Sequence, residues 1–386
     1  MMQLIALFKE NGYEITFAST AGHSNKSTEL HSFGIEEVSI RLNNQSFDDF
    51  VFQLNPSIVI FDRYFTEEKF GWRVAEQCPK ALRLLDTEDL HFLRKAREEA
   101  IKKDQPLNLY SEYAKRELAS ILRCDVSLII SEFEMQLLRE TFGIPEGILY
   151  YLPFLLSPIS EEQQNGLPSF EDRKGFMTIG NLMHEPNVDS VKYLKREIWP
   201  AIREKLPHSD LSIYGNYAPQ YISEMHNPKE GFLIKGWAEN AFEAFAKARV
   251  CLAPLRFGAG LKGKLVDAMQ CGTPSITTGI GAEGITGKFE FAGMIADSSK
   301  DFVADAVRLY SDKDEWLRSQ ENGWQIIAKR FQKEHFSEAF MASIRILQNN
   351  LKEHRQEHFM GQILQHQTIQ ATKFMGRWIE EKNKNR

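Results

Sequence analysis

The sequence predicts an α/β protein with two doubly wound domains, each a parallel sheet covered by helices on both faces. The chain has 386 residues, which suits two domains of about 150–200 residues better than one core. Short apolar runs alternate with helix-length segments in both halves, as is typical of parallel sheets. The polar segment 157–174 carries two prolines and a glycine without apolar periodicity, and predicts a linker between the halves.

Residues 1–156 predict the N-terminal domain. The chain opens on a helical pattern that ends at residues 10–12. We then expect strands at 13–19, 57–62, 81–87 and 126–131, and helices at 67–77, 89–103 and 110–123. Doubly wound domains normally open on a strand and a glycine-bearing turn. Two interpretations therefore stay open: a fold that begins with a helix, or a first strand and its loop lying upstream of Met1.

Residues 175–334 predict a complete second domain, whose loops follow the carboxyl ends of its strands. We expect strands at 176–180, 211–216, 231–237, 250–255 and 274–278, and helices at 188–207, 239–248 and 261–271. The following residues, 279–285, predict a loop. Residues 335–386 have a helical pattern to the end of the chain.

Composition excludes several classes of protein. The formal net charge is −6, so there is no excess of positive charge for a nucleic acid partner. Four cysteines without a C-x-x-C pair predict reduced, buried thiols in a cytoplasmic protein. No apolar run approaches the ~20 residues that span a bilayer. The first residues lack the charged region and cleavage site of a signal peptide.

The most informative motif is RFGAGLKGKLVDAMQCGTP, at 256–274. Its glycines and lysine fit the G-x-x-x-x-G-K spacing of an ATPase P-loop, but Leu265 stands where a P-loop has Ser or Thr for magnesium. The motif also comes late in its domain, and no later strand ends in a suitable acid. The ATPase interpretation is therefore excluded.

The same loop is suited to a diphosphate. A helix starting near Leu261 offers unpaired N–H groups and the positive end of its dipole to an anion. Glycines let the backbone approach a phosphate closely, and cationic side chains add charge-assisted donors. These residues are Gly258 and Gly260, with Arg256, Lys262 and Lys264.

Asp267 lies three residues after Lys264, on the same helical face and one turn further from the phosphate site. A carboxylate at this place can accept hydrogen bonds from both hydroxyls of a ribose. The alternative is an acid that merely complements the helix dipole.

These residues carry a family resemblance. APLRFGAGLKGKLVDAMQCGTPSITTGIGAEGI resembles the donor-nucleotide segment of the retaining GT-B glycosyltransferases (glycosyl transferases group 1, family 4-like). IGNLMHEPNVDSVKYLKREIWPAIREKLPHSDLSIYG is similar to the first strand, loop and helix of that family's C-terminal domain. GWAEN resembles the turn beside the nucleotide base. The match is dense over 175–285 and weaker across the N-terminal half.

The resemblance implies a GT-B fold, with two Rossmann-like domains facing a cleft, and a nucleotide-sugar in the C-terminal domain. Gly180 and Asn181 would face the phosphates and the transferred sugar, and Glu283 would lie near the donor. Arg256 and Lys264 would be the catalytic residues, because they neutralise the leaving diphosphate. Asp267 would bind the ribose.

The chain departs from the family pattern in two places. Many members have two glutamates separated by seven residues, where this chain has Ala259 and Asp267. Any sugar contact made by the first glutamate is therefore in doubt. Members also begin with a strand and a glycine loop before the helix that opens this chain.

Asp89 and His91 are the acceptor-side candidates, since they follow the end of a predicted strand, with Asp89 as a simple helix N-cap as the alternative. We also consider His184 and Asn187 as groups that orient the donor, with Asn187 as a helix cap as the alternative.

The predicted function is transfer of a hexosyl or related sugar from a nucleoside-diphosphate sugar to a glycan, a lipid-linked or another acceptor, with retention. Two alternatives stay open: a non-catalytic nucleotide-sugar-binding scaffold, and a nucleotide-sugar epimerase on the same architecture. We expect no tightly bound cofactor and no metal, because Arg256 and Lys264 take the place of magnesium and no D-x-D motif follows a strand.

The C-terminal tail predicts an amphipathic helix that packs or contacts a partner. Acidic residues interrupt the basic face that membrane-surface helices need. Contact with a second copy of the chain or peripheral contact with a membrane stays open. The apolar residues of this helix are Phe359, Ile363, Ile369, Phe374 and Trp378.

Overall fold

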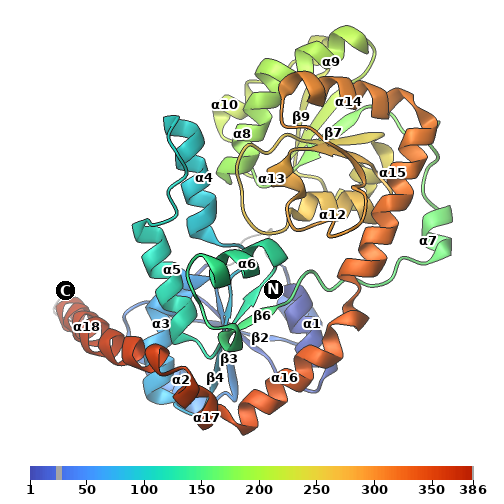
Figure 1. The fold of residues 1–386 in the computed structure, drawn as a ribbon. Helices are drawn as coiled ribbons and strands as arrows, with labels where there is room; N and C mark the ends of the chain where they lie inside the picture. Colours follow the sequence, from blue (N-terminus) through green and yellow to red (C-terminus); the bar gives the residue numbers. More distant parts are fainter. Residues whose placement is uncertain (23–27, 385–386) are drawn as a thin grey trace. The chain divides into compact units, whose positions relative to one another are not determined.

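The computed structural model describes residues 1–22 and 28–384, which form two compact units (Figure 1). Unit 1 comprises Met1–Glu88, Glu112–Leu155 and Lys333–Arg386, and unit 2 comprises Asp89–Ser111 and Leu156–Gln332. The side chains of 369, 370, 372, 383 and 384 lie outside the description, so the place of Ile369 in the tail pattern stays a prediction. Each unit is thus assembled from separate stretches of the sequence.

Unit 2 is built on a six-stranded parallel sheet with the order β12-β11-β10-β7-β8-β9. From β7 the chain adds β8 and β9 on one side, then returns to add β10, β11 and β12 on the other. The order therefore reverses between β7 and β10. Doubly wound sheets bind their ligands outside the carboxyl ends of the strands at such a reversal. The strands are β7 (Phe176–Ile179), β8 (Leu211–Tyr214), β9 (Phe232–Gly236), β10 (Val250–Ala253), β11 (Ser275–Thr277) and β12 (Gly293–Ile295).

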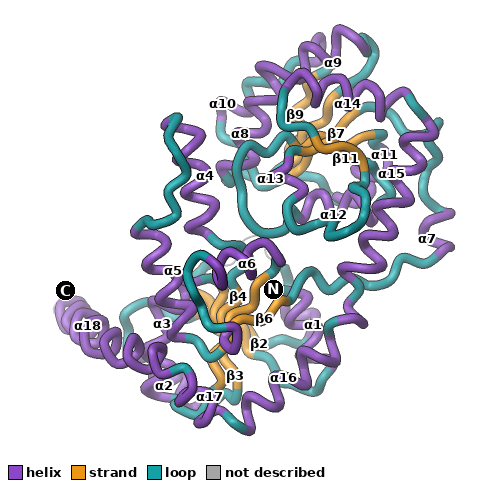
Figure 2. The backbone as a smooth tube through the Cα atoms, viewed as in Figure 1, coloured by secondary structure: helices purple, strands orange, loops and turns teal. Residues whose placement is uncertain are grey.

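Helices cover both faces of this sheet (Figure 2). The helices of unit 2 are α4 (His91–Lys103), α7 (Glu161–Asn165), α8 (Glu185–Tyr193), α9 (Trp199–Lys205), α10 (Gln220–Ser223), α11 (Ala241–Lys247), α12 (Gly263–Gln270), α13 (Gly279–Ala282), α14 (Ser299–Ser311) and α15 (Lys313–Ile326). Two π-helical segments, Leu194–Ile198 and Ile327–Phe331, follow α8 and α15.

Alternation along the strands explains why both faces are covered. Phe176 packs into the core beneath α8, α9 and α14, whereas its neighbour Met177 packs into the core beneath α11 and α12. Leu252 and Cys251 divide in the same way. Successive side chains of a strand point to opposite faces, so a strand that is apolar throughout needs helices on both sides.

Unit 1 has two parallel sheets, one of four strands in the order β3-β4-β5-β6 and one of the strands β1 and β2. The strands are β1 (Thr16–Ser19), β2 (Glu36–Ser39), β3 (Ile58–Asp62), β4 (Leu82–Asp86), β5 (Val126–Ile129) and β6 (Leu149–Tyr151). The helices are α1 (Met2–Glu10), α2 (Gln45–Leu54), α3 (Tyr64–Gln77), α5 (Glu112–Arg123), α6 (Glu132–Glu140), α16 (Ser337–Asn349), α17 (Leu351–Glu357) and α18 (Phe359–Lys384).

Helix α1 packs against the cores beside both of these sheets. Leu4 and Phe8 join a core with the buried residues of β4, β5 and α16, while Ile5 joins a second core with Leu30 and Ile35. Ile15, just before β1, is packed against both. Among the described residues, β1 pairs only with β2, and β3 pairs only with β4.

The C-terminal helix α18 lies against α3 and α5 of unit 1. Its inward face is fixed by ion pairs of Lys373 with Glu76 and of Glu380 with Arg73. Its outward face exposes large apolar side chains: Phe359, Met360, Ile363, Phe374, Met375 and Trp378. The expected helical tail is confirmed, but the predicted apolar residues that the structure describes are exposed, so contact of this face with a partner stays a prediction. None of the helices in 1–22 and 28–384 is both long and apolar enough to cross a membrane.

The structure corrects three local expectations. The linker contains the short helix α7, which begins with a capping box between Ser160 and Gln163. The segment after β11 forms α13 instead of a loop. Helix α12 begins at Gly263 with Lys262 as its N-cap, two residues later than expected.

Candidate functional site

The candidate site lies at the carboxyl edge of the unit 2 sheet. It is formed by the segments that come directly after three adjacent strands. Gly180 and Asn181 follow β7, residues 254–262 join β10 to α12, and α13 follows β11. The neighbours β7 and β10 are the pair where the strand order reverses. Parallel packing therefore brings these segments together although they are far apart in the sequence.

Lys264, the second residue of α12, is joined to the segment after β7. Its Nζ donates to Asn187 Oδ1 at 2.8 Å, and Asn187 Nδ2 donates to the Asn181 carbonyl at 3.0 Å. A Cβ on Gly180 would lie 2.5 Å from Asn187 Nδ2, so only glycine admits this approach. Asn187 is therefore not the cap of α8 but a bridge between α8, α12 and the β7 loop.

The charge states of Lys264 and Asp267 are set by burial. Burial lowers the pKa of Lys264 to about 8 and raises the pKa of Asp267 to about 6. The Asp267 carboxylate accepts a 3.4 Å hydrogen bond from Gln270 Nε2. Both groups are half-buried. Near neutral pH the site thus combines a cation and an anion on one helical face, both incompletely solvated.

The loop between β10 and α12 is held by its own side chains. Lys262, which is buried, donates from Nζ to the Gly260 carbonyl at 2.6 Å. Gly260 has φ 61°, a left-handed conformation that favours glycine. A Cβ on Gly258 would lie 3.1 Å from Lys262 Cε. Lys262 in this structure therefore stabilises the loop.

Arg256 does not join Lys264 in this structure. Its Nε donates to Asp189 Oδ2 at 2.8 Å, its NH2 donates to Asp189 Oδ1, and its guanidinium lies 5.1 Å from the ring centre of Tyr193. The Asp189 hydrogen bond raises the pKa of Arg256 further above its usual range. Its predicted catalytic role stays a prediction.

Glu283, directly after α13, is bound by Arg97 of α4. Arg97 NH1 and NH2 donate to the two carboxylate oxygens, each at 2.8 Å, and NH1 also donates to the Gly258 carbonyl at 2.8 Å. The donor-side residues Gly258 and Glu283 are therefore brought together through a residue that the sequence analysis did not single out.

Asp89 and His91 lie in a polar cluster with Arg94 and His184, all within unit 2. Asp89 is not the N-cap of α4, which is Leu90. Its carboxylate pairs with Arg94 Nε at 2.9 Å and lies 3.3 Å from His91 Nδ1. Arg94 NH1 lies 2.6 Å from His184 Nε2. Burial, and then the charge of Arg94, lower the pKa of His184 to about 4, so this imidazole is neutral and accepts the hydrogen bond.

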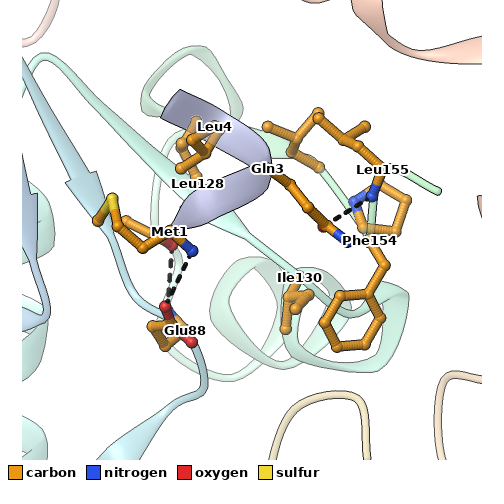
Figure 3. Close-up of a pocket in the computed structure, with 11 residues that line it drawn as sticks. Met1, Gln3, Leu4, Glu88, Leu128, Ile130, Phe154 and Leu155 are labelled. Carbon is orange, nitrogen blue, oxygen red and sulfur yellow. Dashed lines mark hydrogen bonds and ion pairs between the residues drawn. The ribbon is translucent and has the colours of Figure 1, made fainter. Parts of the chain in front are cut away.

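Unit 1 has a separate small cavity of about 60 Å³ at the carboxyl ends of β4, β5 and β6 (Figure 3). The N-terminal amino group of Met1 lies 3.4 Å from Glu88 Oε1, and Gln3 Oε1 accepts a hydrogen bond from the Leu155 amide at 2.9 Å. Asp86 also lines the cavity, where burial and then the charge of Glu88 raise its pKa to about 6. The other lining residues are mostly apolar.

Within the described ranges, no group of three or more His, Cys, Asp or Glu residues is arranged to hold a metal ion. The residues that the sequence analysis missed are Arg97, Asp189 and Tyr193. One sequence feature could have pointed to Arg97: it lies three residues after Arg94, on the same helical face. Asp189 lies 67 residues from Arg256, and no local pattern connects them.

Comparison with known proteins gives a family match over part of the chain and structural matches over most of it. Residues 173–312 match the family described as Glycosyl transferases group 1. Comparison with curated proteins found no match.

Three solved structures illustrate the structural likeness. Anabaena HepE, solved in complex with UDP and glucose, has a TM-score of 0.65 at 13% identity, over 89% of this chain and 95% of HepE. Sucrose-phosphate synthase from Thermosynechococcus elongatus has a TM-score of 0.64 at 15% identity, over 88% and 90%.

The third is the pneumococcal O-GlcNAc transferase GtfA, solved with UDP and GlcNAc, with a TM-score of 0.57 at 19% identity. The match covers 78% of this chain but 59% of GtfA, so the chain spans less than two thirds of that enzyme.

These matches cover 78% to 89% of this chain, so they extend over both parallel-sheet units. The fold is therefore GT-B, with two Rossmann-like domains, and residues 173–312 carry the sequence pattern of group 1 glycosyltransferases.

Proposed function

We propose that this protein is a glycosyltransferase that takes a sugar from a nucleoside-diphosphate sugar bound to unit 2. The single observation that carries the proposal is the Lys264 ammonium. It lies in the first turn of α12, at the strand-order reversal, and its hydrogen-bond partner is the neutral Asn187 amide. In the part of the chain that the structure describes, no carboxylate is paired with it.

Burial disfavours this ammonium, so an anion that replaces lost solvation would be stabilised there. The first N–H groups of α12 add donors and a positive dipole end at the same place. Departure of a nucleoside diphosphate develops negative charge on its phosphates, and preorganised cations stabilise such charge. We propose that Asp267, three residues later on the same helical face, accepts the ribose hydroxyls.

The UDP complexes of HepE and GtfA support a nucleotide donor, and we propose UDP as the first nucleotide to test. Retention of the sugar configuration and transfer of a hexosyl group are proposed from the family resemblance alone. A glycan or a lipid-linked molecule is the proposed acceptor class on the same ground.

The test is calorimetric titration of the purified chain with UDP, GDP, ADP and TDP, beside Lys264→Met and Asp267→Ala. We expect one nucleotide to bind, and Lys264→Met to weaken its binding about 100-fold, which is ~3 kcal/mol and typical of a lost charge-assisted bond. Lys300→Met is the matched control. Lys300 is also the second residue of a helix, α14, but it is exposed.

Binding by Lys264→Met that equals wild-type binding would refute the proposed site, as would no binding of any nucleotide. Hydrolysis of the matching nucleotide-sugar without acceptor then separates an enzyme from a scaffold that only binds.

A further inference from the structure

Helix α4 is part of unit 2, although its neighbours in the sequence on both sides belong to unit 1. Three of its basic side chains contact the segments around the candidate site. Arg94 contacts His184, Lys102 pairs with Glu185, and Arg97 contacts Gly258 and Glu283. The helix therefore has a basic face directed at the loops of the donor side.

Arg97 makes the most extensive of these contacts. Its guanidinium forms a two-pronged pair with Glu283, and the same NH1 that serves one prong donates to the Gly258 carbonyl. The Arg97 and Glu283 side chains are 11% and 14% exposed, so little water competes for these bonds. Such planar two-pronged contacts fix direction as well as distance, which a lysine could not do.

The two partners of Arg97 lie in different segments of the chain. Gly258 is in the loop between β10 and α12, and Glu283 directly follows α13. One side chain thus ties the loop that precedes Lys264 to the C-terminal end of α13, the helix that follows β11. The Arg97 guanidinium also balances the Glu283 carboxylate, whose charge would otherwise oppose a diphosphate bound nearby.

We propose that Arg97 is a positioning residue for donor binding: it holds residues 254–262 and 279–284 in the arrangement that a nucleoside diphosphate requires. The inference rests on the proposed function and extends it to a helix outside the donor-binding sequence motif. Arg97 acts through Gly258 and Glu283, so its loss should weaken donor binding more than it slows the chemical step.

The test compares Arg97→Gln and Arg97→Lys with wild type in nucleotide-sugar hydrolysis and nucleotide titration. For Arg97→Gln we expect KM and the nucleotide Kd to rise at least tenfold while kcat changes less than about threefold. For Arg97→Lys we expect KM and Kd values between those of wild type and Arg97→Gln, because lysine keeps the charge but loses the two-pronged geometry. Lys103→Gln is the matched control, since it removes an exposed cation of the same helix that pairs with Glu99.

A second measurement needs no ligand. Hydrogen–deuterium exchange of the free protein should be faster in 254–262 and 279–284 of Arg97→Gln than in wild type or Lys103→Gln. Unchanged exchange in both loops, or a fall in kcat at constant KM, would overturn the role proposed for Arg97. If wild type binds no nucleotide, the proposed function fails, and the exchange experiment alone decides whether Arg97 orders the loops.

Discussion

The two units differ in whether their parallel sheet is continuous. The sheet of unit 2 is continuous over six strands, with Lys264 and Asp267 beside the reversal of its strand order. In unit 1 the described strands divide into sheets of four and two, and Phe8 of α1 packs against Phe340 of α16 on one side of the larger sheet. A continuous sheet stabilises itself through its ladders, whereas a divided one depends on the helices and ion pairs that join its parts. We therefore expect unit 1 to be the less stable of the two.

The largest expected effect is on the buried ion network of unit 1. Asp125, 3% exposed, accepts hydrogen bonds from the Arg83 amide at 2.8 Å and from Arg355 Nε at 2.7 Å, which joins β4 to α17. Asp125→Asn leaves buried charge unpaired and should lower the free energy of unfolding of unit 1 by about 3–5 kcal/mol. Urea unfolding, followed by fluorescence, measures this loss.

Nucleotide binding by unit 2 should survive Asp125→Asn, and its loss at temperatures where the variant is folded would show that the two units do not differ in stability as proposed. Glu10→Gln is the control, because its pair with Lys333 also joins the two ends of unit 1 but is exposed and should contribute less than about 1 kcal/mol. Burial acts to raise the pKa of Asp125, but bonds from Arg355 and the charge of Arg83 lower it below 3.8. The stabilisation is therefore present above about pH 4 and is lost as the pH falls further.

The second effect concerns the pH dependence of donor binding to unit 2. Lys264 is protonated below its pKa of about 8, and Asp267 is ionised above its pKa of about 6. A diphosphate favours the protonated lysine, so affinity should fall above pH 8, approaching about tenfold per pH unit. Affinity should also fall below pH 6, where Asp267 gains a proton.

Calorimetry with a nucleotide-sugar checks this window, because its two phosphates do not titrate in the range. Lys264→Met should abolish the alkaline decline and Asp267→Asn the acidic one. A flat profile between pH 5 and 9 would contradict our assignment of both residues to the donor.

The smallest expected effect concerns the outward face of α18 in unit 1. Phe374 is 67% exposed, so Phe374→Ser should change the free energy of unfolding by less than about 0.5 kcal/mol. Gly361→Ala is the inward-facing contrast, because a Cβ there would lie 2.2 Å from the Leu122 carbonyl oxygen. The second substitution should lower Tm clearly and the first should not. Equal shifts would mean that α18 does not pack as described.

Local patterns predicted much of the fold, and they also proposed Lys264 and Asp267 as the centre of the site, which stays a prediction. Short apolar runs indicated β3, β4, β5 and the first strands of unit 2, because a buried strand is visible in the sequence as consecutive apolar residues. Short strands such as β2 and β12, with a few residues each, lack enough alternation to be detected. Lys264 and Asp267 could be singled out from the sequence because they are three residues apart, within one turn of a helix.

The contacts that shape the rest of the site are long-range. Arg256 meets Asp189, and Arg97 meets Glu283 186 residues away. No spacing rule connects such pairs, since only the tertiary fold decides which loops become neighbours. For the same reason the sequence placed the segment 89–103 among the elements of the N-terminal half, whereas its contacts are with unit 2.

The assembly of each unit from separated stretches also constrains how the chain is made. Unit 1 needs Lys333–Arg386 to complete its core, since Phe340 and Ile344 are buried against β4 and β5. During synthesis from the N-terminus, unit 2 has all its residues before unit 1 does, although unit 1 begins first. We therefore expect unit 2 to complete its fold on the ribosome before unit 1, although unit 1 contains the first residues to be synthesised. Fragments cut at the apparent linker would leave unit 2 without α4 and unit 1 without its last helices.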